Sequence, residues 1–220
     1  MISVLNPKVG KIGGPVYCFK IALQGTEPPV WRRLLVPGNA TLSWFHAVIQ
    51  VAMGWTNSHL HHFLIGKARY VDPRYDEDMG FGEEPDCDET KTTLAEVVPS
   101  KGAHFVYEYD FGDSWQHKIV VEKILSGGGI DVTHAECVDG ARACPPEDCG
   151  GVWGYANLLK ILKDKKHPEH RTMKEWLGRP LDPEFFDREH TNRWLRKLKW
   201  PRVTEAQLRK ILMGRHSYVE

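Results

Sequence analysis

The sequence has no long hydrophobic run and no excess of charge of either sign, and its number of cysteines is odd. Its apolar stretches are far shorter than the ~18 residues that a membrane-spanning helix needs. The first fifteen residues include two lysines but no apolar segment typical of a signal peptide. The five cysteines are an odd number, which does not favour a framework of structural disulfides. We therefore expect reduced thiols, a cytoplasmic location and no membrane partner.

Several familiar catalytic motifs are also missing. The sequence contains no GxxxxGK[ST] of a phosphate-binding loop, no GxSxG of a serine hydrolase and no HExxH of a zinc protease. No GxGxxG follows a predicted strand, as a dinucleotide-binding fold requires. These absences argue against the enzyme classes that depend on those motifs.

Aromatic residues are plentiful, with 8 Trp, 7 Tyr and 8 Phe, and 41% of the chain is hydrophobic. This composition is typical of a folded protein, and 220 residues suit one domain spanning 1–220. The net charge is zero but unevenly placed. Residues 1–150 carry 13 basic and 20 acidic side chains, whereas residues 151–220 carry 16 and 9. Either the two parts attract each other, which we favour, or the basic part holds a polyanion.

Five segments have the residue pattern of strands: 16–23, 30–36, 59–65, 104–111 and 115–125. The first two are expected to form an antiparallel hairpin. A two-residue turn at 112–113 would join the last two, which sets Asp110 opposite Trp115 and Glu108 opposite His117.

Apolar spacing and capping residues predict helices near 43–53, 93–98, 152–163, 168–177, 182–198 and 204–213. Residues 72–91 carry nine acidic and two basic side chains and are expected to be a mobile loop. Residues 131–151 also resemble a loop. Because strands and helices are segregated, we expect an α+β fold: a mostly antiparallel sheet with helices packed on it and a helical C-terminal part.

Three polar motifs stand out. His59 and His61 lie two residues apart, so both imidazoles can reach one metal ion from a strand face. Residues 109–117 bring Asp110, Asp113 and His117 to the two sides of one turn, and His117 is a candidate third metal ligand. The alternatives are histidines packed in the core and carboxylates that only bind turn amides.

The third motif, CPPEDCGG at 144–151, presents Glu147 and Asp148 just before a predicted helix. Two prolines make the approach rigid, and two glycines allow another chain or a ligand to come close. A helix cap is the alternative. The cysteines give a further, less favoured metal site of the Cys₃His type, for which buried thiols are the alternative. Its ligands would be His134, Cys137, Cys144 and Cys149.

Three segments together resemble the plasmid pRiA4b ORF-3-like family: PPVWRRLLVPGNATLSWFHAVIQVAMGWTNSHLHHF, YDFGDSWQHKIVVE and CPPEDCGGVWGY. The resemblance covers about residues 16–198 and leaves 199–220 as a helical extension. It implies an α+β fold but no established activity. Some relatives travel with mobile elements and carry resolvase-like labels. A serine recombinase needs a nucleophilic serine near its N-terminus among several arginines. Here Ser3 is the only early serine and no arginine precedes Arg32, so the sequence does not support the resolvase-like label.

Two classes of function follow. In the first, which we favour, the three motifs converge on one pocket, with their nitrogen and oxygen atoms about 4–6 Å apart. The pocket would bind a divalent metal such as zinc or a small ligand and could support hydrolysis. Its side chains would be His59, His61, Asp110, Asp113, His117, Glu147 and Asp148. In the second, a non-enzymatic accessory module linked to mobile elements binds nucleic acid or a protein partner through basic helices. Its contacts would be Lys160, Lys163, Lys165, Lys166, Arg193, Arg196, Lys197 and Lys199.

Overall fold

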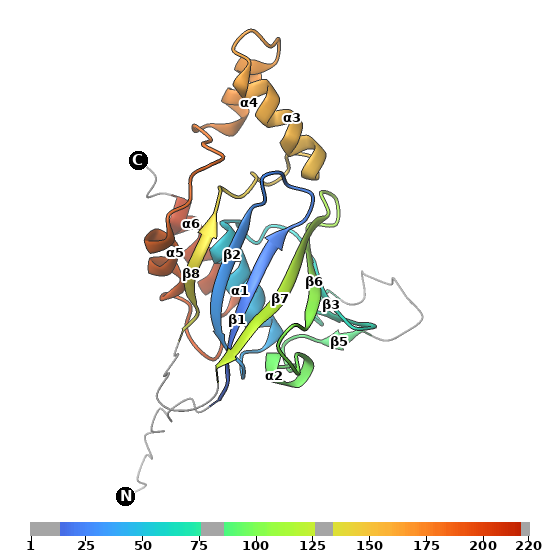
Figure 1. Ribbon diagram of the computed structural model, residues 1–220. Helices are drawn as coiled ribbons and strands as arrows, with labels where there is room; N and C mark the ends of the chain where they lie inside the picture. Colours follow the sequence, from blue (N-terminus) through green and yellow to red (C-terminus); the bar gives the residue numbers. More distant parts are fainter. Residues whose placement is uncertain (1–13, 76–85, 126–133, 217–220) are drawn as a thin grey trace, which may run out of the picture.

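The structure is a computed structural model that describes residues 14–75, 86–125 and 134–216 (Figure 1). Its strands are β1 (Val16–Leu23), β2 (Trp31–Pro37), β3 (His61–Ile65), β4 (Ala68–Val71), β5 (Cys87–Asp88), β6 (His104–Tyr109), β7 (Trp115–Leu125) and β8 (Glu136–Ala141). Its helices are α1 (Leu42–Met53), α2 (Leu94–Val97), α3 (Gly151–Lys163), α4 (His170–Leu177), α5 (Arg188–Leu195) and α6 (Glu205–His216). The predicted α+β class is confirmed.

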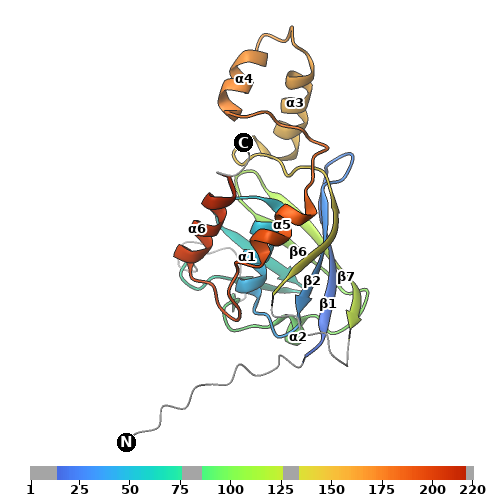
Figure 2. The same ribbon diagram turned by 90° about the vertical axis from the view of Figure 1, so that its left-hand side faces the viewer.

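The strands form one sheet in the order β5-β4-β3-β6-β7-β1-β2-β8. Every neighbouring pair is antiparallel except β4 and β5. Helices α1, α5 and α6 gather on one face of the sheet, while α3 and α4 project beyond one end of it (Figures 1 and 2). None of the helices in the described ranges is long and apolar enough to cross a membrane.

Helix α1 lies at the centre of the core. The Thr41 hydroxyl accepts a hydrogen bond from the Trp44 amide, and Gly54 ends the helix in the left-handed region at φ 104°. Every residue of α1 except Ser43 is buried, as expected of a helix that is mostly apolar all round. The ring of Phe45 lies 5.0 Å from that of Phe19 on β1, and burial of such a side chain stabilises the fold by about 1.5–3 kcal/mol.

The turn between β6 and β7 differs from the prediction. It spans five residues, 110–114, and pairs Tyr109 with Trp115 and Tyr107 with His117. The reason lies in Asp110, which adopts φ 59° and accepts hydrogen bonds from the next amides at 112 and 113. This local closure ends the strand earlier than the apolar pattern indicates.

Several other boundaries also differ. Strand β8 occupies part of the predicted loop 131–151, and β4 and β5 were not expected. Helix α5 begins at Arg188 because Asp187 caps it by accepting from the amide of residue 190. Helix α4 forms within the predicted range 168–177, but none of its residues is buried, so its apolar side chains do not join the core. In the acidic segment 72–91, residues 76–85 lie outside the described residues, but Asp72 and Glu89 are buried.

Candidate functional site

Three side chains from distant parts of the sequence meet at one end of the sheet. His59 Nε2 lies 3.1 Å from Asp148 Oδ1 and 3.6 Å from Asp110 Oδ2. One ligand atom from each residue lies within 4.8 Å of the others. Among the described residues, this is the only group of three or more His, Cys, Asp or Glu side chains with such spacing. The structure thus brings together one residue from each of the three motifs.

His59 is held in place through its backbone. It lies just before β3, and its amide and that of Ser58 donate to Tyr109 Oη at 3.3 and 2.9 Å. Tyr109 Oη donates in turn to Glu147 Oε1 at 2.5 Å. Glu147 also accepts from the amide and the hydroxyl of Thr56. Glu147 therefore connects the 144–151 loop to the His59 segment through hydrogen bonds. It is not a member of the three-residue group.

The two aspartates of the group are positioned by unusual backbone. Asp110 and Asp148 adopt φ 59° and 58°, a left-handed conformation in which Asp is enriched. Asp113, also predicted to line the pocket, instead accepts from the Gly150 amide at 3.2 Å and holds the loop on the turn. A Cβ on Gly151 would lie 2.5 Å from the Asp113 carbonyl oxygen, so the close approach of loop and turn requires glycine.

The group is partly open to solvent. The side chains of Asp110, His59 and Asp148 are 10%, 27% and 69% exposed. His59 Nε2 is buried and makes no hydrogen bond to the described residues, although a carboxylate oxygen lies 3.1 Å away. An imidazole nitrogen and two carboxylate oxygens form a ligand set for divalent metals, and three protein ligands leave positions open for water or substrate.

His61 lines a cavity of about 970 Å³ together with His59, but it contacts different groups. Its ring stacks on His46 at 3.5 Å, and its Nε2 lies 3.0 Å from Glu89 Oε2. Burial lowers the pKa of His46 and of His61 to about 3 and raises the pKa of Glu89 to about 8. At neutral pH this places a protonated carboxyl next to a neutral imidazole. His61 is absent from the group formed by His59, Asp110 and Asp148, so the geometry does not show the predicted sharing of one metal ion by His59 and His61.

The sequence analysis missed His46 and Glu89. His46 lies beside the apolar stripe of α1 rather than on it. A surface residue of an amphipathic helix is expected at such a position. Glu89 is one of nine acidic residues in a segment expected to be a mobile loop. No local signal marks Glu89, because its place is set by tertiary contacts: its amide donates to the Val71 carbonyl oxygen, and its own carbonyl oxygen accepts from the Ser43 amide.

His117 is a core residue rather than a metal ligand. It is fully buried, its Nδ1 lies 3.2 Å from the Tyr107 carbonyl oxygen, and its ring packs edge-on against Trp55 at 5.1 Å. Burial lowers its pKa to about 4. It is absent from the group formed by His59, Asp110 and Asp148.

The cysteine site is not formed either. All five cysteines are free thiols, and the candidate Cys₃His ligands do not cluster among the described residues. Burial raises the pKa of Cys137 to about 11 and raises that of Cys144 further, so both are buried neutral thiols. The reason is topological: Cys137 lies within β8, whereas Cys144 and Cys149 lie in the loop that leaves it.

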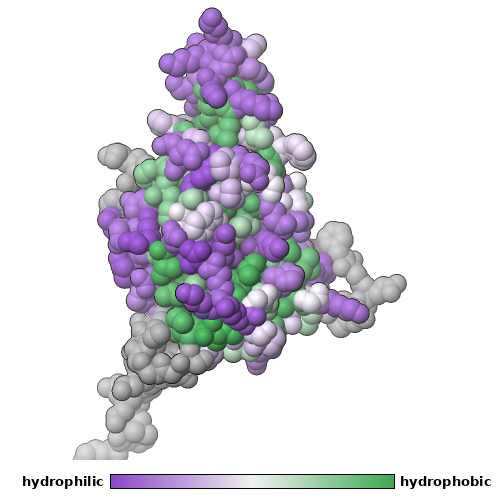
Figure 3. Space-filling view, viewed as in Figure 1, coloured by the Kyte–Doolittle hydropathy of each residue, from purple (hydrophilic) through white to green (hydrophobic). Residues whose placement is uncertain are grey.

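The basic side chains of the predicted nucleic-acid surface are all exposed, but they fall into two groups. Four lysines lie at the end of α3 and just after it, where Figure 3 shows a strongly hydrophilic tip. The other four lie on or after α5, which packs on the body of the protein (Figures 1 and 2). Two tryptophans near the second group are engaged in packing, since Trp194 is buried and Trp200 packs edge-on against Trp44. The arrangement is two basic surfaces rather than one.

Comparisons with known proteins agree on the family. The family model for plasmid pRiA4b ORF-3-like proteins matches residues 15–190. An uncharacterized protein, y4hQ of Sinorhizobium fredii, is 39% identical over 160 residues, which are 72% of this chain and 79% of that protein. The crystal structure of a protein of unknown function, MM3350 from Methanosarcina mazei, matches with a TM-score of 0.69 and 36% identity over 80% of this chain and 97% of that one. The chain therefore belongs to the plasmid pRiA4b ORF-3-like family.

Proposed function

We propose that the protein binds a divalent metal ion through His59, Asp110 and Asp148, and that this ion acts on a small ligand held in the adjoining cavity of about 970 Å³. The observation that supports the proposal is the short separation of the three ligand atoms. Ligands that lie about 2.1 Å from one ion are at most about 4.2 Å apart. The two separations from His59 Nε2, 3.1 and 3.6 Å, fit that limit, and the two carboxylate oxygens lie within 4.8 Å of each other.

The surroundings of the group favour a reactive site over a purely structural one. Structural zinc sites are closed by four protein ligands, whereas this group has three and remains partly exposed. A bound ion would have room for a water molecule whose pKa it lowers. The His61–Glu89 pair lines the same cavity as His59 and holds a proton near neutral pH, as a general acid requires. Hydrolysis of a small ligand is the reaction class that this arrangement supports best.

A second candidate function, binding of nucleic acid, is supported by the projecting α3–α4 unit. Its lysines, Lys160, Lys163, Lys165 and Lys166, are exposed. Binding through such a tip would weaken steeply with salt, because it depends on phosphate contacts. Loss of duplex binding on neutralising these lysines, with metal binding unchanged, would favour this function.

The test of the metal proposal is calorimetry on protein freed of metal by chelation. Zn²⁺, Mn²⁺ and Mg²⁺ are titrated into the natural protein and into H59A, D110N and D148N. The two asparagines preserve the left-handed backbone, and at Asp110 they also keep an acceptor for the turn amides. H104A, an exposed histidine on β6, is the matched control.

We expect one ion per chain for at least one metal, an affinity loss of about 100-fold or more in each of the three variants and no loss in H104A. Absence of binding by the natural protein, or equal binding by H59A and the natural protein, would overturn the proposal.

A further inference from the structure

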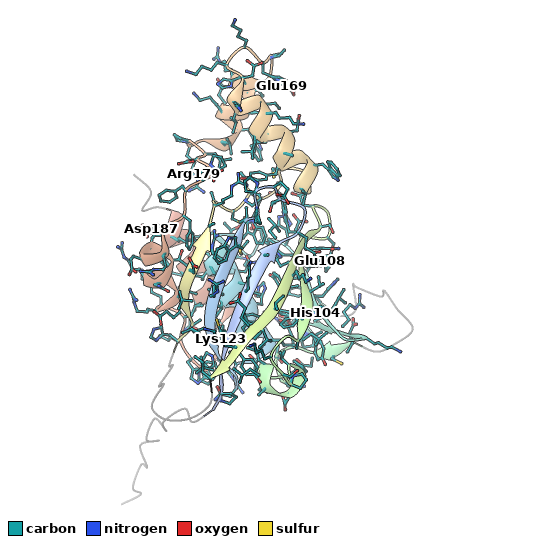
Figure 4. The ribbon with its side chains drawn as sticks, viewed as in Figure 1. His104, Glu108, Lys123, Glu169, Arg179 and Asp187 are labelled. Atoms are coloured by element: carbon teal, nitrogen blue, oxygen red, sulfur yellow. The ribbon has the colours of Figure 1, made fainter. Side chains whose placement is uncertain are left out.

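A second cavity, of about 610 Å³, lies beside the C-terminal end of α1, separate from the His59 group. Its walls come from the 143–147 loop, the connection between α4 and α5, and α6. Many of the wall residues are apolar, including Trp176, Leu181 and Phe186. Three arginines, Arg32, Arg179 and Arg215, also line it, and Figure 4 shows Arg179 on the connection between α4 and α5.

Arg32 is a buried cation whose partners among the described residues are neutral. Only 2% of the residue is exposed. Its guanidinium donates to the carbonyl oxygens of Ala52, Trp31 and Ala141 at 2.8–2.9 Å. One face of the guanidinium lies 4.2 Å from the ring centre of Phe186. The side chain is thus held rigidly at the cavity wall without a carboxylate partner among the described residues.

Arg215 on α6 is half-buried and also binds the C-terminal end of α1. Its Nη1 donates to the Val51 carbonyl oxygen at 2.6 Å, and a Cβ on Gly54 would lie 2.6 Å from the same nitrogen. Burial, together with the positive charges of Arg32 and Arg179, lowers its pKa to about 10. The guanidinium groups of Arg32 and Arg215 bind the carbonyl oxygens of two consecutive residues, Ala52 and Val51, so both positive charges lie at the same end of α1.

The carboxylates of the cavity make no direct ion pair with these arginines. No ion pair within the described residues involves Arg32, Arg179 or Arg215. Glu147 is bonded to Tyr109 and Thr56. The remaining two wall carboxylates, Asp182 and Asp187, accept from backbone amides in their own turns.

The C-terminal end of α1 explains only part of the arrangement. Val51 and Ala52 belong to the last turn of α1, so the two arginines cap its free carbonyl groups. A helix C-terminus is equivalent to about half a negative charge. The walls also carry three carboxylates, so the cavity has no net excess of positive charge, but among the described residues none of them pairs directly with either guanidinium group. Guanidinium groups beside apolar walls without a direct carboxylate partner are stabilised by an anion that reaches them.

We propose that this second cavity binds a small organic anion, with its carboxylate or phosphate group on Arg32 and Arg215 and its apolar body against Phe186 and Trp176. A guanidinium group presents paired donors that match either anion. The volume lies within the range of small-molecule sites. The proposal does not depend on the metal site, because none of its arguments uses His59, Asp110 or Asp148.

The test uses three probes that share a phenyl ring: benzoate, phenyl phosphate and neutral benzyl alcohol. Binding to the natural protein is measured by calorimetry and by tryptophan fluorescence. We expect at least one anion to bind with a dissociation constant below about 1 mM, and benzyl alcohol to bind at least tenfold more weakly. The comparison of benzoate with phenyl phosphate identifies which anionic group the site prefers.

Variants locate the site. R215Q is expected to weaken anion binding by at least about tenfold. R215K is expected to weaken it less, because Lys keeps the positive charge but lacks the paired donors of a guanidinium group. R209Q is the matched control on the same helix, since Arg209 lines the other cavity. W176F should remove the fluorescence change and keep most of the binding heat.

Absence of binding by both anions, equal binding of benzyl alcohol, or equal losses in R215Q and R209Q would each overturn the proposal. Circular dichroism checks that the variants fold. Should R215Q fail to fold, R179Q changes the rim of the same cavity, and unchanged anion affinity in both R179Q and R215K would overturn the proposal as well.

Discussion

The buried Glu89 should make the protein less stable as the pH rises above neutrality. Its side chain is 1% exposed, its Oε2 lies 3.0 Å from His61 Nε2, and its Oε1 has no hydrogen-bond partner among the described residues. Burial raises its pKa from 4.5 to about 8. Between these values the folded protein keeps a proton that the unfolded chain releases. The free energy of unfolding therefore falls with pH in this window.

The size of the effect follows from the window. One proton difference changes the free energy of unfolding by about 1.4 kcal/mol per pH unit. The buried histidines His46 and His61 act in the opposite direction, because their pKa values fall from 6.5 to about 3. Their contribution fades within about one pH unit above 6.5, as the histidines of the unfolded chain lose their protons. The contribution of Glu89 itself lowers the free energy of unfolding by about 2 kcal/mol from pH 6.5 to 8, and comparison with a variant that keeps the histidines isolates it.

The assay is urea unfolding of the natural protein and of E89Q at pH 6.5, 7, 7.5 and 8. Gln keeps a neutral donor toward His61 but cannot ionise, so the stability of E89Q should exceed that of the natural protein by about 2 kcal/mol more at pH 8 than at pH 6.5. E136Q, which changes an exposed carboxylate on β8, should show no such difference. Parallel pH profiles of E89Q and the natural protein would refute the reasoning.

Three further predictions concern the 144–151 loop and the helical part. G151A should destabilise the protein by about 1–3 kcal/mol in urea unfolding, because Gly151 has φ 65° and a Cβ there would lie 2.5 Å from the Asp113 carbonyl oxygen; equal stability would contradict the docking of loop on turn. E147Q should weaken metal binding about 10–100-fold in calorimetry, because Glu147 braces the His59 segment through Tyr109 without joining the group; unchanged affinity would contradict that role. Limited proteolysis should release no stable 151–220 fragment, because α5 and α6 pack on α1; such a fragment would contradict a single domain.

The fold was largely predictable where local chemistry and apolar pattern agree. Thr41 and Gly54 delimit α1, and the period-two pattern delimits β1, because each signal acts within a few residues. Strand β8 was missed because it follows a glycine run and contains Glu136, Asp139 and Gly140, which are rare in strands. It forms because its backbone completes the edge beside β2, and that is a tertiary effect.

The site was predictable as a convergence of motifs but not as a ligand set. Which histidine approaches the carboxylates depends on the left-handed turns at Asp110 and Asp148, which the sequence pattern does not specify. The shorter β6 strand moves His117 beside Tyr107 in the core. The His61–Glu89 pair depends on a contact between residues 28 positions apart, formed only when residue 89 lies at the edge of the folded sheet.

The most direct test of the metal site is anomalous diffraction from crystals grown without metal and soaked in Mn²⁺ or Zn²⁺. The proposed function predicts an anomalous peak about 2.0–2.2 Å from His59 Nε2 and from carboxylate oxygens of Asp110 and Asp148. The same peak should be absent from D148N crystals and present in H104A crystals. A soaked crystal with no peak at His59, or with its only strong peak at the cysteines or at His61, would contradict it.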